Sequence, residues 1–424
     1  MPAPILLDLS HTSHTRARTG IQRVARSLAR ELGPAAAPVT YDPHQRTWRP
    51  LDAWELKNLA TDSFSQKRGA TWPLTAQLRA KFRSIKSSAL NVKRSAFFPS
   101  PSDPRAPRLS PLAPNSGLLL PELFTPAVAA ALPTLFAATN GPRAAVFHDA
   151  IALKFPELTP AKTVARFPSY LRELLAFDGI AANSEDSRAT LLSYWDWLEV
   201  PENARPLVTA IPLGIDPVCH LMDDKLPAPP SVAQLSTLHS QRLPTVLSVG
   251  SLEGRKNHLA LLDACESLWS NGAKFELHLI GLAHPQTGRA ARARVHALQA
   301  AGRPLRYSGP VTDAALAAAY AACTFTVYPS LIEGFGLPVL ESLAHGKPCL
   351  CSARGALGEA ARDGGCLTLD RVDAPSLTAA LGRLLSTPAE LAALAHAARA
   401  RRFRSWSDYA RDLAAWLPTL RRRP

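Results

Sequence analysis

The fourteen residues from Tyr328 to Glu341 combine a strand end, a glycine-containing loop, two carboxylates and a helix start. The run before the loop, residues 324–328, is β-branched and aromatic and predicts a buried strand, which Pro329 ends because proline has no backbone donor. Pro338 suits the first turn of a helix, which we expect to run to about His345. Ligands of α/β folds bind where strands end, so this loop is a candidate binding site.

The two carboxylates of this stretch have different environments. Glu333 lies on the loop, and Glu341 lies near the helix start, off the apolar stripe of the helix. An acid and base pair for glycoside hydrolysis would flank one bond at roughly 5 to 9.5 Å, and the present arrangement fits ligand binding better. Gly334 and Gly336 let a ligand approach the backbone, a helix N-terminus suits a phosphate, and carboxylates accept hydrogen bonds from sugar hydroxyls. The alternative is a surface loop with a capping acid.

A second motif follows the apolar strand Val246–Gly250. Arg255 and Lys256 stand just before Asn257, the expected N-cap of a helix through Trp269. Two cations at the positive end of a helix dipole destabilise it by about 0.3 to 1 kcal/mol each, and a bound anion reverses the sign. The local physics favours a diphosphate pocket over the alternative, a solvated basic turn.

The N-terminal half opens with the same order of strand, loop and helix. Residues 5–9 predict a short apolar strand, and Ile21–Leu32 predict an amphipathic helix. The loop from Ser10 to Gly20 is expected to face the central crevice, because ligands collect at the carboxyl ends of strands in Rossmann-like sheets. For Gly20 itself, a plain helix-start turn is the alternative.

Two further strands of this half end in polar residues. The apolar run Ala144–Asp149 places His148 at a strand end, where it is either a site residue or a structural one. Residues 179–187 run from a strand into a helix start, with Asn183 or Ser184 as the expected N-cap.

Strands and helices alternate on both sides of residues 217–244, which are rich in Pro, Ser and Leu. A chain of 424 residues with 46% hydrophobic content is long enough for two domains with full cores. We therefore predict an α/β protein with two Rossmann-like domains facing a central cleft, residues 1–216 and 245–400, with a linker at 217–244.

The net charge of +14 is uneven along the chain. Residues 66–108 contain ten Lys and Arg against one Asp, and residues 399–424 contain eight Arg against two Asp. Basic patches suggest nucleic acid, anionic lipid or phosphate-bearing substrates, although 37 Arg against 11 Lys indicates coding bias and weakens this argument. Apolar residues at helical spacing from Leu74 to Ile85 predict a basic amphipathic helix in a Pro-rich insertion at about 60–115, either on a membrane surface or packed by one edge in solvent.

Membrane and metal signals are weak. The chain has no apolar run of the roughly 18 residues that a transmembrane helix needs, and Asp8 stands where a signal peptide would be apolar, so a cytoplasmic location is expected. The six cysteines form no C-x-x-C pair and suggest reduced core residues. Cys349 and Cys351 are too close for a zinc knuckle and are expected to alternate across a strand, so no metal site is predicted.

A family resemblance rests on these motifs. Glu333 and Glu341, eight positions apart within Glu-Gly-Phe-Gly-Leu-Pro and Leu-Glu-Ser-Leu-Ala-His-Gly-Lys-Pro, resemble the E-x7-E motif of glycosyltransferase family 4, retaining sugar transferases of the GT-B fold. Gly-Ser-Leu-Glu-Gly-Arg-Lys-Asn resembles the diphosphate-binding segment of that family, and Thr19–Val24 its opening, with one glycine where members often have two. The resemblance covers most of the chain except residues 42–114.

The resemblance implies roles for single residues. In the C-terminal domain, Arg255 and Lys256 would bind the donor diphosphate, Glu333 the sugar hydroxyls and Glu341 the ribose. Residues 401–424 would form a C-terminal helix that packs back across the domains, and Ile211–Asp216 resembles the last strand of the N-terminal domain. The remaining implied positions are Gly334, Phe335, Gly336 and Leu337 near sugar and phosphate, Gly250 beside the donor, Val311 and Asp313 near the base, His148 beside the transferred sugar, and Gly20 and Ser184 on the acceptor side.

The resemblance also implies an activity. We expect a retaining hexosyltransferase that uses a nucleotide-diphosphate sugar, GDP-mannose by similarity to bacterial mannosyl- and rhamnosyltransferases of surface polysaccharides, and a glycan or lipid-linked acceptor. We expect no cofactor and no catalytic metal, no nucleic-acid partner, and contact with the inner face of an anionic membrane. The alternatives are another GT-B enzyme, such as a nucleotide-sugar epimerase or phosphorylase, and a basic nucleic-acid-binding protein.

Overall fold

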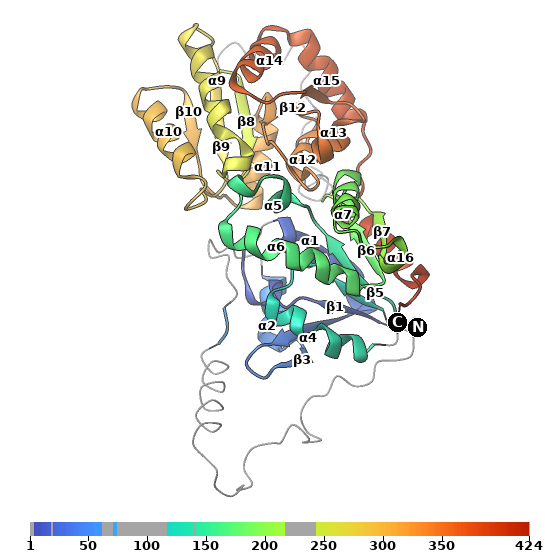
Figure 1. The fold of residues 1–424 in the computed structure, drawn as a ribbon. Helices are drawn as coiled ribbons and strands as arrows, with labels where there is room; N and C mark the ends of the chain where they lie inside the picture. The colour runs from blue at the N-terminus through green and yellow to red at the C-terminus, as the bar shows by residue number, and fades with distance from the viewer. Residues whose placement is uncertain are drawn as a thin grey trace, which may run out of the picture.

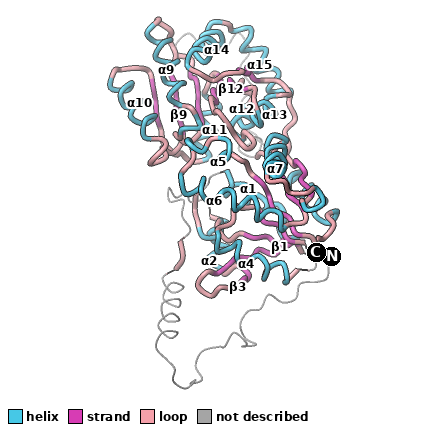
Figure 2. The backbone as a smooth tube through the Cα atoms, in the orientation of Figure 1, coloured by secondary structure: helices cyan, strands magenta, loops and turns pink. Residues whose placement is uncertain are grey.

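The computed structural model describes residues 4–17, 20–61, 71–73, 117–139, 141–216 and 243–423. The expected basic helix, most of the insertion at 60–115 and all but the last two residues of the expected linker lie outside these ranges. Within them, the chain forms two sheets flanked by helices (Figures 1 and 2). Of the helices in these ranges, none has the length and apolar character that crossing a bilayer requires.

The N-terminal sheet has seven strands in the order β3-β2-β1-β4-β5-β6-β7. All neighbours pair in parallel except β2 and β3, which form an antiparallel edge. The strands are β1 Ile5–Asp8, β2 Ala36–Asp42, β3 Thr47–Pro50, β4 Leu118–Leu120, β5 Arg143–Phe147, β6 Gly179–Ala182 and β7 Leu207–Ala210. The helices are α1 Gly20–Leu32, α2 Ala53–Ala60, α4 Pro126–Ala137, α5 Ile151–Lys154, α6 Ala161–Glu173 and α7 Glu185–Trp197.

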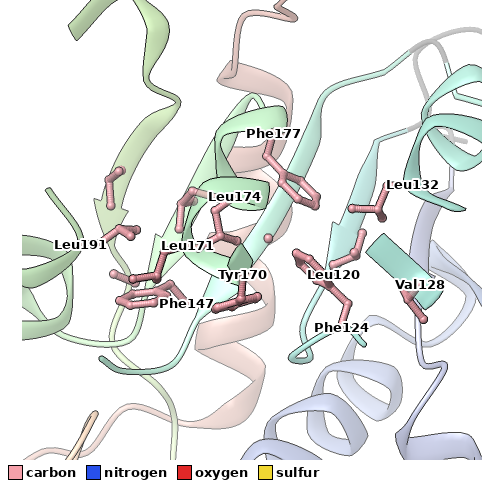
Figure 3. Packing of buried hydrophobic residues seen from close by; sticks show 14 of the residues in the cluster. Leu120, Phe124, Val128, Leu132, Phe147, Tyr170, Leu171, Leu174, Phe177 and Leu191 are labelled. Carbon is pink, nitrogen blue, oxygen red and sulfur yellow. The ribbon is translucent and has the colours of Figure 1, made fainter. Parts of the chain in front are cut away.

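A core of aromatic and branched side chains fills the space between this sheet and its helices (Figure 3). Phe147 of β5, Tyr170 of α6 and Phe177, just before β6, are all buried in it. Because the inner strands are covered on both faces, their sequences are almost uniformly apolar, as is typical of parallel sheets.

The C-terminal sheet has six parallel strands in the order β10-β9-β8-β11-β12-β13. The strands are β8 Thr245–Val249, β9 Glu276–Ile280, β10 Leu305–Tyr307, β11 Phe325–Tyr328, β12 Cys349–Ser352 and β13 Cys366–Leu369. The helices are α9 His258–Ser270, α10 Arg289–Ala300, α11 Asp313–Ala322, α12 Leu337–Ala344, α13 Gly355–Ala361, α14 Ala374–Ser386 and α15 Pro388–Ala400. The prediction of an α/β protein with parallel sheets is confirmed.

The last helix, α16 (Trp406–Trp416), packs against α1 and the N-terminal sheet rather than the sheet that precedes it in sequence. Its entry is fixed by a bridge between Ile215 and Ser405. Gly214 permits this contact, because a Cβ there would lie 2.3 Å from the Ser405 backbone.

The expectation of a strand at Ile211–Asp216 is wrong. The last strand of the N-terminal sheet, β7, ends at Ala210. Ile211 still donates its N–H to the carbonyl of Ala182 at 2.8 Å, but Pro212 has no donor to continue the ladder, and the chain leaves the sheet there.

Candidate active site

The candidate donor loop joins β11 to α12, as the sequence predicts. Gly336, at the N-cap position of α12, has φ of 96°, a left-handed conformation that favours glycine. Pro338 lies in the first turn of the helix. These local constraints place Glu333 on the loop and Glu341 in the helix, at the carboxyl edge of the sheet.

Glu333 lies at the centre of a buried charge cluster. Its Oε1 accepts hydrogen bonds from Nη1 of Arg255 at 2.8 Å and from Nζ of Lys256 at 2.6 Å. The Tyr328 hydroxyl donates to the same oxygen at 3.0 Å. Burial alone would raise the pKa of Glu333, but the two cations lower it to about 2. The structure therefore brings together the predicted diphosphate-binding cations and the predicted sugar-binding carboxylate.

Lys256 is held against an aromatic wall. Its Nζ lies 4.6 Å from the centre of the Tyr328 ring and also contacts the Tyr328 hydroxyl. Burial lowers the pKa of Lys256 despite its contact with Glu333. Gly250 lies beside this pair, since a Cβ built there would be 3.6 Å from Tyr328 and 3.8 Å from Lys256.

Asn257 occupies the N-cap position of α9, but its side chain does not cap the helix. The short 3-10 turn Gly254–Lys256 leaves Asn257 in a left-handed conformation, with φ of 57°. Its side-chain amide instead donates to the carbonyl of Val372 at 2.6 Å. The amide therefore fixes the turn that carries both cations.

Glu341 forms an ion pair that the sequence did not predict. Nη1 of Arg23, on α1, donates to Oε1 of Glu341. Nη2 of Arg23 also donates to Asp216 at 3.2 Å, and the Tyr320 hydroxyl donates to the other Glu341 oxygen at 3.4 Å. The predicted ribose-binding carboxylate is thus occupied by a cation from the N-terminal sheet's first helix.

His148 is buried at the end of β5, and both ring nitrogens have partners. Nε2 donates to the carbonyl of Pro121 at 2.8 Å, while Nδ1 accepts from the side-chain amide of Asn183 at 3.1 Å. Burial lowers the pKa of His148, which favours the neutral ring. These contacts fix the imidazole directly behind the donor loop.

Gly334 joins the donor loop to the N-terminal half. A Cβ at Gly334 would lie 2.2 Å from the carbonyl oxygen of His148, so only glycine fits this approach. The Gly334 carbonyl accepts hydrogen bonds from Ser184 at 2.8 Å and Ser187 at 3.3 Å. Ser184 is also the N-cap of α7, since its Oγ accepts from the Ser187 N–H. Ser184 therefore has both the predicted capping role and a place beside the donor loop.

The remaining predicted positions lie around this centre. Phe335 and Leu337 pack against the core formed by α1, α16 and the N-terminal sheet. Val311 is partly buried in the small cluster behind β8 and β9. Asp313 is exposed and is the first residue of α11, not its N-cap.

Thr312 and Asp313 are both suitable N-cap residues for α11. Thr312 is the N-cap, because its hydroxyl accepts a hydrogen bond from the Ala315 N–H at 3.2 Å. In the N-terminal half, Gly20 begins α1, and a Cβ there would meet nothing within 4 Å. Gly20 is therefore not required by packing within the described residues.

A buried acidic pair at the carboxyl ends of β1 and β4 was missed by the sequence analysis. Glu122 accepts the backbone N–H groups of His11 and Thr12, each at 2.9 Å. Asp8 accepts the Ser10 N–H at 3.0 Å, and burial together with Glu122 raises the pKa of Asp8 to about 7. The pair shapes the loop expected to face the cleft. The available signal was that both acids follow apolar strands, which is where ligand sites of parallel sheets lie.

Comparison with known proteins agrees with this geometry. A family model described as glycosyl transferases group 1 matches residues 236–401. The match covers the C-terminal sheet and the helices that flank it. The chain is also 26% identical over 354 residues to the serotype-specific mannosyltransferase WbdA of Escherichia coli, covering 82% of this chain and 38% of WbdA. It is 30% identical over 268 residues to the O-antigen chain mannosyltransferase B of Escherichia coli, covering 62% of this chain and 66% of that protein.

The chain spans little more than a third of the length of WbdA. Among solved structures, Anabaena HepE in complex with UDP and glucose matches with a TM-score of 0.65 at 15% identity, covering 99% of this chain and all of HepE. Sucrose-phosphate synthase of Thermosynechococcus elongatus matches with a TM-score of 0.62 at 18% identity, covering 98% of each chain. The GT-B prediction and the predicted resemblance to bacterial mannosyltransferases of surface polysaccharides are confirmed.

The ion pair between Arg23 and Glu341 leads to a first prediction. Arg23→Ala removes the cation that occupies Glu341, so a nucleoside diphosphate should bind roughly two- to fivefold more tightly by calorimetry. Arg30→Ala is the matched control, because Arg30 also pairs with Asp216, at 3.2 Å, but has no contact with Glu341 among the described residues. Equal affinities for both variants, or weaker binding by Arg23→Ala, would contradict the competition.

The close approach of Gly334 leads to a second prediction. Gly334→Ala should push the C-terminal domain away from His148 and, for an enzyme whose site lies here, lower turnover by roughly 10²-fold, since small displacements of reacting groups have effects of this size. Small-angle scattering should show a more open molecule. Gly382→Ala is the control. Gly382 lies inside α14, and its Cβ would be 3.4 Å from Leu268, an ordinary van der Waals distance. Normal activity of Gly334→Ala would show that the approach is not needed.

Proposed function

We propose that this chain is a retaining glycosyltransferase of family 4 that moves a hexose from a nucleotide-diphosphate sugar to a glycan or lipid-linked glycan. One observation carries the proposal: Arg255 and Lys256 both donate to Oε1 of Glu333, at 2.8 and 2.6 Å. One buried and one partly buried cation beside a carboxylate that can accept hydrogen bonds from sugar hydroxyls fit a phosphate joined to a sugar. The names of the curated relatives support the same activity.

In this proposal the donor replaces contacts that the cluster makes with itself. The diphosphate takes the guanidinium of Arg255 and the ammonium of Lys256, which frees Glu333 to accept sugar hydroxyls. The ribose takes Glu341 from Arg23 in the same way. Two cations of the protein neutralise the leaving phosphate, so the chemistry requires no divalent metal.

The proposed transfer is a front-face displacement, because no side chain is assigned as a nucleophile on the opposite face of the sugar. The acceptor hydroxyl attacks C1 of the sugar on the face that the phosphate leaves. The bond from C1 to the phosphate oxygen breaks, and that oxygen takes the acceptor's proton. His148, neutral and fixed by Pro121 and Asn183, supports the wall beside the sugar and keeps water out of the closed cleft.

GDP-mannose is the proposed donor, because the curated relatives are mannosyltransferases. The basic charge of the chain favours an anionic partner. The proposed location of the protein is the cytoplasmic face of a membrane that carries a lipid-linked acceptor. Vesicle co-sedimentation with and without anionic lipid tests this part separately from the chemistry.

A thermal-shift screen over GDP, UDP, ADP and TDP tests the donor class. We expect stabilisation by GDP at millimolar concentration, since a ligand that binds only the folded state raises its stability by mass action. Incubation with GDP-mannose alone, followed by product analysis, distinguishes transfer from isomerisation of the donor. Absence of a shift with all four nucleotides would overturn the proposal, and a shift with another base would correct the donor.

A further inference from the structure

Three cysteine thiols lie together on β12 and β13 of the C-terminal sheet. Cys349 and Cys351 are two residues apart on β12, so their side chains share one face, while Leu350 between them packs into the core on the other face. Cys366 opens β13 and is the register partner of Cys349. The three sulfur atoms all lie within 4.8 Å of one another. Strand pairing thus completes a thiol group that the C-x-C spacing alone did not predict.

The surroundings of the three thiols are apolar and well packed. Val339 and Leu343 of α12 and Ala398 of α15 belong to the same cluster. Cys349 and Cys351 are each 1% exposed, whereas Cys366 is only partly buried. Two of the sulfurs are therefore shielded from solvent, and the third gives the group an open side.

The spacing of the sulfurs fits one metal ion. Three points no more than 4.8 Å apart fit in a circle whose radius is 4.8 Å divided by √3, about 2.8 Å, and a zinc–sulfur bond is about 2.3 Å. A central ion would therefore need each sulfur to move by about half an ångström at most, which side-chain rotation provides. Thiolate ligands select thiophilic ions such as Zn²⁺ over Mg²⁺ or Ca²⁺.

Arg401 supplies a positive charge beside the thiols. Its side chain is 7% exposed, and its guanidinium donates to the carbonyls of Ala360 and Gly364 at 2.9 and 3.2 Å. Its charge acts on Cys366, and its buried Nε has no hydrogen-bond partner among the described residues. The carboxylate of Asp363, at 3.5 Å, is largely exposed and compensates it weakly. Three thiolates and a divalent ion carry one net negative charge, which this buried cation matches.

We propose that Cys349, Cys351 and Cys366 bind one thiophilic divalent metal ion, such as Zn²⁺, with Arg401 as the counter-charge and a solvent molecule as the fourth ligand. Each thiol releases its proton as it binds. The ion ties the edge strand β13 to β12 beneath α12, the helix that carries Glu341. The site stabilises the C-terminal domain, contains none of the residues assigned to the donor and does not depend on the proposed function.

Cadmium titration of the full chain, stripped with chelator under reducing conditions, tests the site. We expect a sulfur-to-cadmium absorption band that saturates at one ion per chain, one bound zinc by elemental analysis, and a rise in Tm of several degrees with either metal. Cys366→Ala should lose the band and the Tm shift. Cys265→Ala is the matched control, because Cys265 is also buried in this domain but lies in a different cluster.

A second measurement uses the unaltered protein and does not depend on how the variants fold. Iodoacetamide should label Cys366 in the metal-free protein, as the partly exposed member, and should fail to label it after zinc is added. A band retained in Cys366→Ala, or equal labelling of Cys366 with and without zinc, would overturn the proposal.

Discussion

Replacing Glu333 by glutamine is expected to lower kcat by about two to three orders of magnitude while tightening the binding of a free nucleoside diphosphate. Glutamine keeps the shape of the side chain but loses the negative charge that Arg255 and Lys256 share at 2.8 and 2.6 Å. In the proposed complex both cations are then left for the diphosphate alone. The sugar loses a charged acceptor for its hydroxyls at the same time, so turnover falls although nucleotide affinity rises.

The two effects are measured separately, by steady-state kinetics with the nucleotide sugar and by calorimetry with the nucleoside diphosphate. The ligand-free variant should also unfold at a lower temperature than the wild type, because a broken buried ion pair leaves uncompensated charge, and added phosphate should restore part of the loss. Glu276→Gln is the control, since Glu276 pairs with Arg306 at 3.1 Å at the amino end of β9. Near-normal turnover of Glu333→Gln, or weaker nucleotide binding, would contradict the clamp model.

The parts of the site that the sequence predicted are those fixed by local signals. The donor loop was predictable because Pro329 ends a strand, Gly336 adopts a left-handed conformation and Pro338 starts a helix, all within ten residues of one another. Ser184 was predictable as a cap because its hydroxyl bonds to a backbone N–H three residues later. Each of these signals depends on a few neighbouring residues and not on the way the two halves meet.

The parts that were missed depend on contacts between distant segments. Arg23 and Glu341 are 318 residues apart, and their pairing exists only because the fold brings α1 close to α12. The acidic pair Asp8 and Glu122 requires that β1 and β4 be neighbours, an order that the intervening strands conceal. The cap of α11 illustrates a different limit, because Thr312 and Asp313 are both good capping residues and the sequence alone does not rank adjacent candidates.

Lys256→Ala is expected to lower kcat/KM by roughly two to three orders of magnitude and, unlike Glu333→Gln, to weaken nucleotide binding. Lys256 is 6% exposed, and its ammonium lies between Glu333 and the ring of Tyr328. Without it, the diphosphate of the proposed complex loses one of its two cations, and Glu333 remains paired with Arg255. Both changes weaken donor binding and reduce the stabilisation of the negative charge that develops on the leaving phosphate.

The control for Lys256→Ala is Lys347, a partly buried lysine in the turn between α12 and β12. Lys347 donates to the carbonyls of Ala321 and Cys323, each at 2.8 Å, so Lys347→Ala should lower Tm and leave kcat/KM and nucleotide affinity close to wild type. If Lys256 acted only by supporting the fold, the two variants would behave alike.

The double variant Glu333→Gln with Lys256→Ala gives the decisive comparison. If the donor must displace Glu333 from Lys256 to bind, the effects of the two substitutions on nucleotide affinity are coupled. The change in binding free energy of the double variant then departs from the sum of the two single changes. Additive effects would mean that Lys256 and Glu333 act on the donor independently, and their contact at 2.6 Å in the ligand-free protein would then have no part in donor binding.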